Sequence, residues 1–224
     1  MLTADRYQEL RTTMTDLGRT LSPEQASAVV PACPSWSVKD VYSHMAGNAA
    51  DILAGNIAEA GTDPWTAAQV EARRDRSLAE VLDEWDRLGP QVEDALKALE
   101  DMIDPRLIVD QWTHEQDLRG AVGRPGGRDS STARWCAGRL TRGFEGRARA
   151  AGLQPLTVDF GDEQVHPKEG SPAGTVAVDR FEFVRAGMGR RSRAQVRAWA
   201  WSVDPGPYVG TVAVFPARET DLVE

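Results

Sequence analysis

Apolar residues recur at intervals of three and four along much of residues 1–152, and this spacing constrains the fold more than any other feature. In the first segment the stripe consists of Tyr7, Leu10, Met14, Leu17 and Leu21. Such steps place side chains on one face of an α-helix, whereas a strand would alternate at every second residue. The pattern therefore predicts a helix that buries one face, as in a helical bundle.

Serine–acid pairs mark the starts of two further helices. Ser37 is followed three residues later by Asp40, and Ser77 is followed by Glu80, which is the spacing of a capping box. Apolar residues at helical spacing come after each pair. The second of these helices contains Pro90, which is expected to kink or split it.

Two more helices are expected in the N-terminal part. One lies between Pro105 and Gly123, and the other runs from about Ser131 to Ala151. Proline at a helix start and glycine just past its end are typical boundaries. Four long helices can form a bundle with a site inside it.

The pattern changes after Gly152. Short runs rich in β-branched residues and bounded by glycine or proline indicate strands. The predicted strands are residues 156–160, 175–178 and 208–215, and helical pieces are expected at 179–188 and 192–201. The predicted fold class is therefore α+β, with a helical domain over residues 1–152 and a smaller α/β domain over 153–224.

The candidate functional residues lie on two of the predicted helices. Asp110 and His114 are four residues apart, so they stack on one helical face. His44 lies on the second helix, where Asn48 and Asp51 share its stripe. Two histidines and one carboxylate suit a divalent metal that keeps open positions. The sequence therefore predicts a metal site between the two helices.

Simpler interpretations exist for each of these residues. His44 alone could be a hydrogen-bonded histidine at a helix edge, and Asp110 with His114 could be an exposed pair on a solvated face. Asp117 is interpreted as an acceptor that orients a liganding imidazole. Cys33 is interpreted as a packing residue in a proline-rich turn, and neither it nor Cys136 is expected to be a nucleophile.

Composition excludes several classes of protein. A hydrophobic share of 41% is ample for a core in 224 residues, and no apolar run approaches the roughly 18 residues needed to span a membrane. The N-terminus lacks a basic region followed by an apolar one, so we expect a cytoplasmic protein with no membrane partner. The net charge of -8 disfavours nucleic acid as the main partner. The two cysteines form no Cys-x-x-Cys pair, and we expect both to be reduced.

Four segments together resemble a known family. They are residues 33–44 (CPSWSVKDVYSH), 110–119 (DQWTHEQDLR), 123–126 (GRPG) and 189–195 (GRRSRAQ). Their residues and spacing resemble the mycothiol-dependent maleylpyruvate isomerase family, whose N-terminal part is a DinB-like four-helix bundle. The last segment is similar to the smaller C-terminal domain of that family.

The resemblance implies a metal cofactor. In the family a divalent metal, usually zinc, is held by a histidine of the second helix and by an acid-x-x-x-histidine pair on a later helix. These positions correspond to His44, Asp110 and His114. The isomerase carries glutamate at the middle position, so the aspartate here shortens the reach by one methylene.

The resemblance also implies an enzyme that uses a low-molecular-weight thiol such as mycothiol. The metal would lower the thiol pKa from about 8.5, so that a thiolate attacks a small electrophile. Release of the thiol after bond rotation would be an isomerisation, and its retention would be a transfer. Asn48, Asp51 or Asp117 could assist proton movement, and Arg190 or Arg191 could bind a substrate carboxylate.

Two other classes of function remain open at this point. One is a binding module that holds a metal or a small ligand without turnover. The other is metal-assisted hydrolysis, which lacks an obvious general base because Glu115 projects about 100° round the helix from His114. The expected partners are a small-molecule substrate and a thiol, and the expected oligomeric state is a monomer or a homodimer.

Overall fold

A computed structural model describes residues 1–99, 104 and 106–224 of the chain. Contacts between Cα atoms divide it into two compact units, Met1–Arg124 and Pro125–Glu224. Helices predominate in the described residues and the sheets are small, so the α+β fold class is confirmed. None of the helices among the described residues is both long and apolar enough to cross a membrane.

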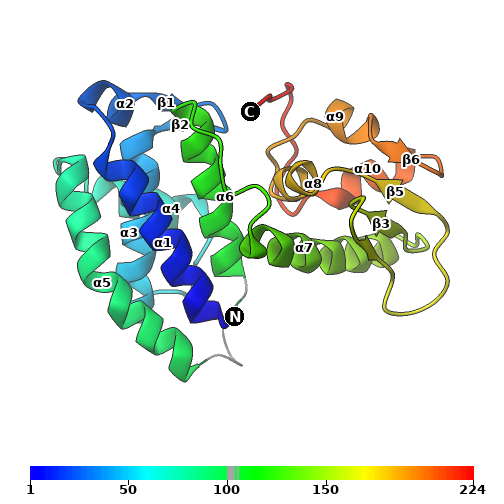
Figure 1. Ribbon diagram of the computed structural model, residues 1–224, viewed down its shortest axis with the longest axis horizontal. Coiled ribbons are helices and arrows are strands. Elements are labelled where there is room, and N and C mark those ends of the chain that lie inside the picture. The colour runs from blue at the N-terminus through cyan, green and yellow to red at the C-terminus, as the bar shows by residue number, and fades with distance from the viewer. Residues whose placement is uncertain (100–103, 105) are drawn as a thin grey trace. The chain divides into compact units, whose positions relative to one another are not determined.

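The first unit is built from helices and one small hairpin. Its elements are α1 (Thr3–Arg19), α2 (Pro23–Ser27), β1 (Val29–Val30), β2 (Cys33–Ser37), α3 (Val38–Ala54), α4 (Asp63–Glu71), α5 (Leu78–Ala98) and α6 (Arg106–Ala121). β1 and β2 pair antiparallel. Within this unit α1 lies against α5 and α6, while α3 lies against α4, α5 and α6 (Figure 1).

The predicted starts of two helices are confirmed in detail. Ser37 accepts a hydrogen bond from the amide of Asp40, whose carboxylate accepts one from the amide of Ser37. Ser77 and Glu80 make the same pair of bonds at the start of α5. α5 continues through Pro90 without a break, so the predicted split does not occur.

The core of the first unit follows the predicted apolar stripes. Tyr7, Leu10 and Met14 of α1 are buried, as are Val38 and Val41 of α3. Helix α4 was not predicted, because residues 61–65 (GTDPW) indicate a polar connection that leads to the helix beginning at Ser77. It begins with a proline in its first turn, which is a common helix start.

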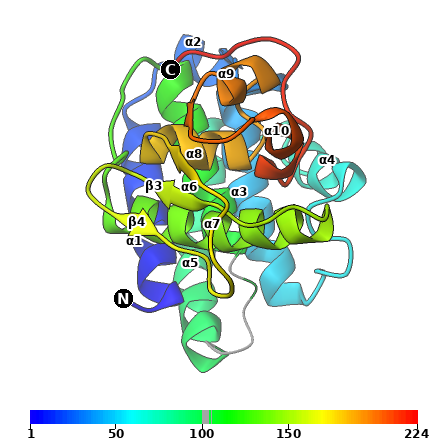
Figure 2. The ribbon, with the colours of Figure 1, turned by 90° about the vertical axis from the view of Figure 1, so that its right-hand side faces the viewer.

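The second unit combines one long helix with a small mixed sheet. Its elements are α7 (Ser131–Ala150), β3 (Thr157–Asp159), β4 (Gln164–Val165), β5 (Thr175–Ala177), α8 (Arg180–Gly187), α9 (Arg193–Arg197), β6 (Ala200–Trp201) and α10 (Gly206–Val212). The strand order is β4-β3-β5-β6, and β3 and β4 can be seen beside each other in Figure 2. β3 is parallel to β5, and the two outer pairs are antiparallel.

The predicted strand over residues 208–215 is wrong, because the chain there forms α10. Pro207 lies in the first turn of this helix, where proline is favoured. The buried residues Tyr208, Val209 and Val212 lie on one helical face. Packing on that face overrides the strand preference of the β-branched residues.

Helix α7 was expected in the N-terminal domain, yet it groups with the second unit. It packs against α8 and α10. The rings of Phe144 and Phe183 lie 6.2 Å apart, and the side chain of Leu140 contacts Gly187 so closely that a Cβ at this glycine would lie 3.0 Å from it. The division after Arg124 therefore differs from the boundary near Gly152 that the sequence predicted.

Candidate metal centre

The three predicted ligands come together in the first unit. The Nε2 atom of His44 lies 3.5 Å from Oδ2 of Asp110, and the Nε2 atom of His114 lies 3.5 Å from Oδ1 of the same carboxylate. The three ligand atoms lie within 4.8 Å of one another. His44 is supplied by α3, and the other two residues are supplied by α6.

The separations of these atoms fit a metal ion better than a hydrogen-bonded cluster. Nitrogen–oxygen hydrogen bonds are usually about 2.7–3.2 Å long, so contacts of 3.5 Å are weak. A tetrahedral ion with bonds of about 2.0–2.2 Å separates its ligands by about 3.3–3.6 Å. His44, Asp110 and His114 therefore form a donor set whose separations are compatible with a divalent ion, with each histidine facing a different oxygen of Asp110.

An oxygen acceptor faces the other ring nitrogen of each histidine. Nδ1 of His44 lies 2.6 Å from Oε1 of Gln69 on α4. Nδ1 of His114 lies 3.0 Å from Oδ2 of Asp117, at ion-pair distance but without the alignment of a hydrogen bond. An acceptor at Nδ1 favours a proton there and leaves the Nε2 lone pair for a cation, and of the two contacts only that of His44 with Gln69 is a hydrogen bond.

Two tryptophans border the histidines. The ring of Trp36 on β2 stacks on His114 at 5.8 Å and lies tilted over His44 at 5.2 Å. Trp65 on α4 meets His44 edge-on at 6.3 Å. Both histidines are buried, whereas the side chain of Asp110 is 31% exposed. Of the three candidate ligands, Asp110 is thus the one that solvent or a small molecule reaches most readily.

Cys33 is closer to the cluster than the sequence suggested. Its thiol donates a hydrogen bond to Oδ2 of Asp117 at 3.4 Å. Cys33, His114 and Asp117 form a second group whose ligand atoms lie within 4.8 Å of one another. The interpretation of Cys33 as a packing residue is therefore incomplete, because its thiol contacts a carboxylate beside the cluster.

The remaining candidates of the first unit lie near the cluster in different roles. Asn48 donates a hydrogen bond of 3.4 Å to Oδ2 of Asp110. Asp51 lies beyond Gln69 and accepts a hydrogen bond of 2.6 Å from its amide. Oδ2 of Asp117 lies 3.0 Å from Nδ1 of His114. All three therefore contact a candidate ligand or a residue that contacts one.

Arg190 and Arg191 belong to the second unit. Arg191 is buried and forms ion pairs with Glu182 and Glu224 at 2.5 and 3.0 Å. Arg190 donates to the carbonyl of Met188. Because carboxylates of its own unit already occupy Arg191, we do not propose it as a substrate ligand.

Glu115 contacts Arg119 rather than the candidate ligands, in agreement with the prediction that it points away from the metal side. It accepts a hydrogen bond of 2.9 Å from Arg119. Burial raises the pKa of the Glu115 carboxyl above its ordinary value, although Arg119 opposes this effect. Glu115 therefore stabilises α6 and its surroundings rather than serving as a general base at the cluster.

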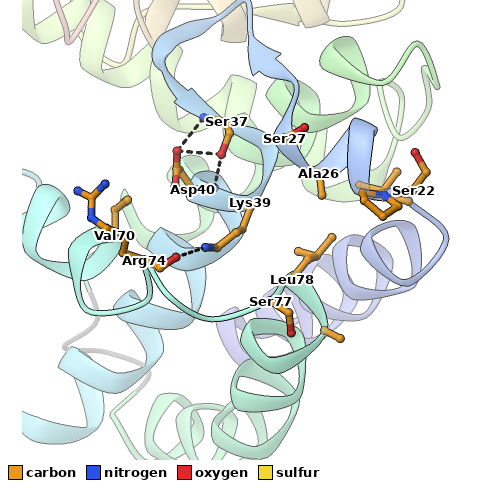
Figure 3. A pocket seen from close by; sticks show the side chains of 13 residues that line it. Ser22, Ala26, Ser27, Ser37, Lys39, Asp40, Val70, Arg74, Ser77 and Leu78 are labelled. Carbon is orange, nitrogen blue, oxygen red and sulfur yellow. Dashed lines mark hydrogen bonds between the residues drawn. The ribbon is translucent and has the colours of Figure 1, made fainter.

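A separate hollow of about 600 Å³ lies where the starts of α3 and α5 approach α2 and the end of α4 (Figure 3). Its described lining includes the capping pair Ser37 and Asp40, and Lys39, which donates a hydrogen bond to the carbonyl of Arg74. The three candidate ligands do not line it. The hollow is therefore separate from the candidate metal centre.

Sequence reasoning missed Gln69, Trp36 and Trp65. Trp36 lies in the segment that carries the family resemblance, so its position was a usable signal. Gln69 and Trp65 lie on the unpredicted helix α4, where no motif or periodicity marks them.

Comparison with known families identifies the family of the chain. Comparisons with curated proteins and with solved structures found no match. The model of the mycothiol maleylpyruvate isomerase N-terminal domain matches residues 7–119, which include every residue of the cluster. The match covers about half of the chain, and the chain therefore belongs to the family of proteins that carry this domain.

Proposed function

We propose that His44, Asp110 and His114 hold a divalent metal ion, most simply zinc, and that the chain is an enzyme acting with a low-molecular-weight thiol such as mycothiol on a small electrophile. The observation that carries the proposal is the convergence of two imidazole Nε2 atoms on one carboxylate, each at 3.5 Å. Three acceptor atoms facing one another are stabilised by a cation.

The proposal extends to the fold of the first unit, which would be a DinB-like four-helix bundle. The contacts of α1 and α3 with α5 and α6 are those that a DinB-like four-helix bundle would make, and they place both ligand-bearing helices in contact. Three protein ligands leave a coordination position open, which is typical of catalytic sites rather than structural ones. When bound, the ion would supply Lewis acidity that lowers the pKa of a thiol.

The residues of the chain have distinct parts in this proposal. His44 and His114 present lone pairs, and Asp110 contributes the negative charge at the more exposed side of the cluster. Trp36 and Trp65 cover the imidazoles with apolar surface and limit the access of water. The thiol comes from outside the chain, and the reaction class is isomerisation or transfer.

Elemental analysis of the purified protein tests the metal assignment. We expect close to one divalent ion per chain, and His44→Ala or His114→Ala should remove it while leaving the helical spectrum largely intact. His166→Ala is the matched control, since this histidine lies in the second unit beside Thr157. Full metal content in both cluster variants would show that the assignment is wrong.

A thiol-consumption assay tests the proposed chemistry. With an electrophile such as a maleyl compound, the metal-loaded protein should either consume mycothiol, as a transfer requires, or convert the cis compound to its trans isomer only when mycothiol is present. The His44→Ala protein should do neither. Metal binding without any thiol-dependent reaction would favour the alternative of a binding module, while ester hydrolysis without thiol would favour the alternative of a hydrolase.

A further inference from the structure

We propose that Gln69, itself held by Asp51, is a positioning residue that keeps the proton of His44 on Nδ1 and so directs the Nε2 lone pair toward Asp110 and His114. This inference deepens the proposed function, and it rests on that function only in identifying the partner of the lone pair as a metal.

The orientation of the Gln69 amide follows from its two partners. Its Nε2 group lies 2.6 Å from Oδ2 of Asp51, and its Oε1 lies 2.6 Å from Nδ1 of His44. An ionised carboxylate only accepts hydrogen bonds, so the amide NH₂ group must face Asp51. The amide oxygen then faces His44, and Nδ1 of His44 must be the donor.

Asp51 is itself fixed in place. Its other oxygen, Oδ1, accepts a hydrogen bond of 2.9 Å from the side chain of Asn56. Gln69 is only 4% exposed, so reversing its amide would place its buried oxygen against an acceptor oxygen of Asp51. The hydrogen bonds that link Asp51, Gln69 and His44 therefore have one favourable arrangement of protons.

The packing of α3 and α4 allows these hydrogen bonds to form. His44, Gly47 and Asp51 lie on one face of α3 at positions i, i+3 and i+7. A Cβ at Gly47 would lie 2.5 Å from Cβ of Gln69. The missing side chain thus creates the space in which Gln69 spans from His44 to Asp51.

The arrangement matters because neutral histidine in water prefers its proton on Nε2, the atom that would have to bind the ion. Without an acceptor at Nδ1, the buried ring could place its proton on Nε2 and donate it to Asp110, which would oppose metal binding. Mutating a residue that hydrogen-bonds to a metal-binding histidine typically weakens metal affinity by about 10–100-fold.

The direct test is the tautomer of His44 in the metal-free protein. Nitrogen-15 spectra of the imidazoles distinguish a proton on Nδ1 from one on Nε2, and only three histidines are present. In the wild-type chain we expect the His44 proton on Nδ1. Gln69→Leu, which keeps the side chain's size, should shift the population toward Nε2, while the signals of His166, which lies beside Thr157 in the second unit, serve as an internal reference.

A designed rescue separates positioning from packing. Gln69→Glu combined with Asp51→Asn reverses the donor and acceptor between these two residues but still offers His44 an acceptor. We expect the double variant to restore the Nδ1 tautomer and most of the metal affinity, measured by competition with a chelator, whereas Gln69→Leu should bind metal about 10–100-fold more weakly.

The outcomes are distinguishable from those of the proposed function. If the wild-type His44 carries its proton on Nε2, or if Gln69→Leu leaves the tautomer unchanged, the positioning role is overturned even if metal binds. If the tautomer responds as expected but the wild-type chain binds no metal, the proposed function fails and the positioning role stands. Should Gln69→Leu not fold, Asp51→Ala, which frees the amide to rotate, gives the same readout.

Discussion

Asp162 is the single residue whose environment gives the second unit its clearest pH dependence. It bridges two helices, accepting hydrogen bonds of 2.6 Å from Arg180 and from Arg134. These bonds, that from Arg180 first, hold the pKa of Asp162 at about 2. A depressed pKa in the folded state means that ionised Asp162 stabilises the fold above the ordinary pKa of about 4.

This stabilisation is lost as the pH falls through about 2. We therefore predict that Asp162→Asn lowers the urea midpoint of the second unit at pH 7, and that the difference from wild type shrinks as the pH is lowered from about 4 toward 2. Glu219→Gln, at an exposed position of the same unit, is the control and should show little pH-dependent difference. A difference that stays constant with pH would contradict the ionic explanation.

The residues of the candidate metal centre were predictable to different extents. Asp110 and His114 could be predicted as neighbours because four residues along a helix return to the same face. The meeting of His44 with that pair was expected from helical phase and family spacing. Gln69 could not be found, since its contact with His44 depends on how closely α4 approaches α3 at Gly47, and that distance leaves no periodic trace in the sequence.

At the scale of elements, the N-caps of α3 and α5 form a matched pair. Ser37 with Asp40 and Ser77 with Glu80 make the same reciprocal bonds. We predict that Ser37→Ala and Ser77→Ala each lower the free energy of unfolding by about 1 kcal/mol, as is typical for losing such a cap. Chemical denaturation of the two variants beside the wild type measures this directly.

The two cap variants should keep the metal content of the wild type. His44 lies two turns into α3, beyond the residues that fray when a cap is lost. Loss of metal in Ser37→Ala alone would indicate that the position of β2 and Trp36, rather than the cap, is coupled to the centre. A free-energy change below about 0.3 kcal/mol in both variants would contradict the assigned capping role.

Elements with strong local signals were predictable, and elements defined by packing were not. The apolar stripe of α1 and the N-caps of α3 and α5 are each determined by residues close together in the sequence. In contrast, residues 208–215 carry strand-forming side chains, yet α10 forms there because Tyr208, Val209 and Val212 bury one helical face. Short β-branched runs do not distinguish a strand from a buried helical turn.

At the scale of the whole molecule, the two proposed boundaries make different predictions. The family match ends at residue 119, and the contacts divide the chain after Arg124. The change in sequence pattern instead places a boundary near Gly152. The difference is α7, whose residues Leu140 and Phe144 pack on α8.

Truncation distinguishes the two boundaries. All the candidate metal ligands and the acceptors at their Nδ1 atoms lie before residue 119. A chain ending at Arg124 should therefore unfold cooperatively and bind as much metal as the full chain. A chain ending at Gly152 should also bind metal, but its α7 would lose α8 and α10 and expose a row of apolar side chains to water.

Hydrogen exchange of the chain ending at Gly152 provides the measurement. We expect the amides of α7 to exchange rapidly, because an isolated helix of 20 residues is marginally stable without a packed face. The amides of α3 and α6 should stay protected in both truncated chains. Protection of α7 equal to that in the full chain would instead show that this helix folds with the first unit and would support the boundary near Gly152.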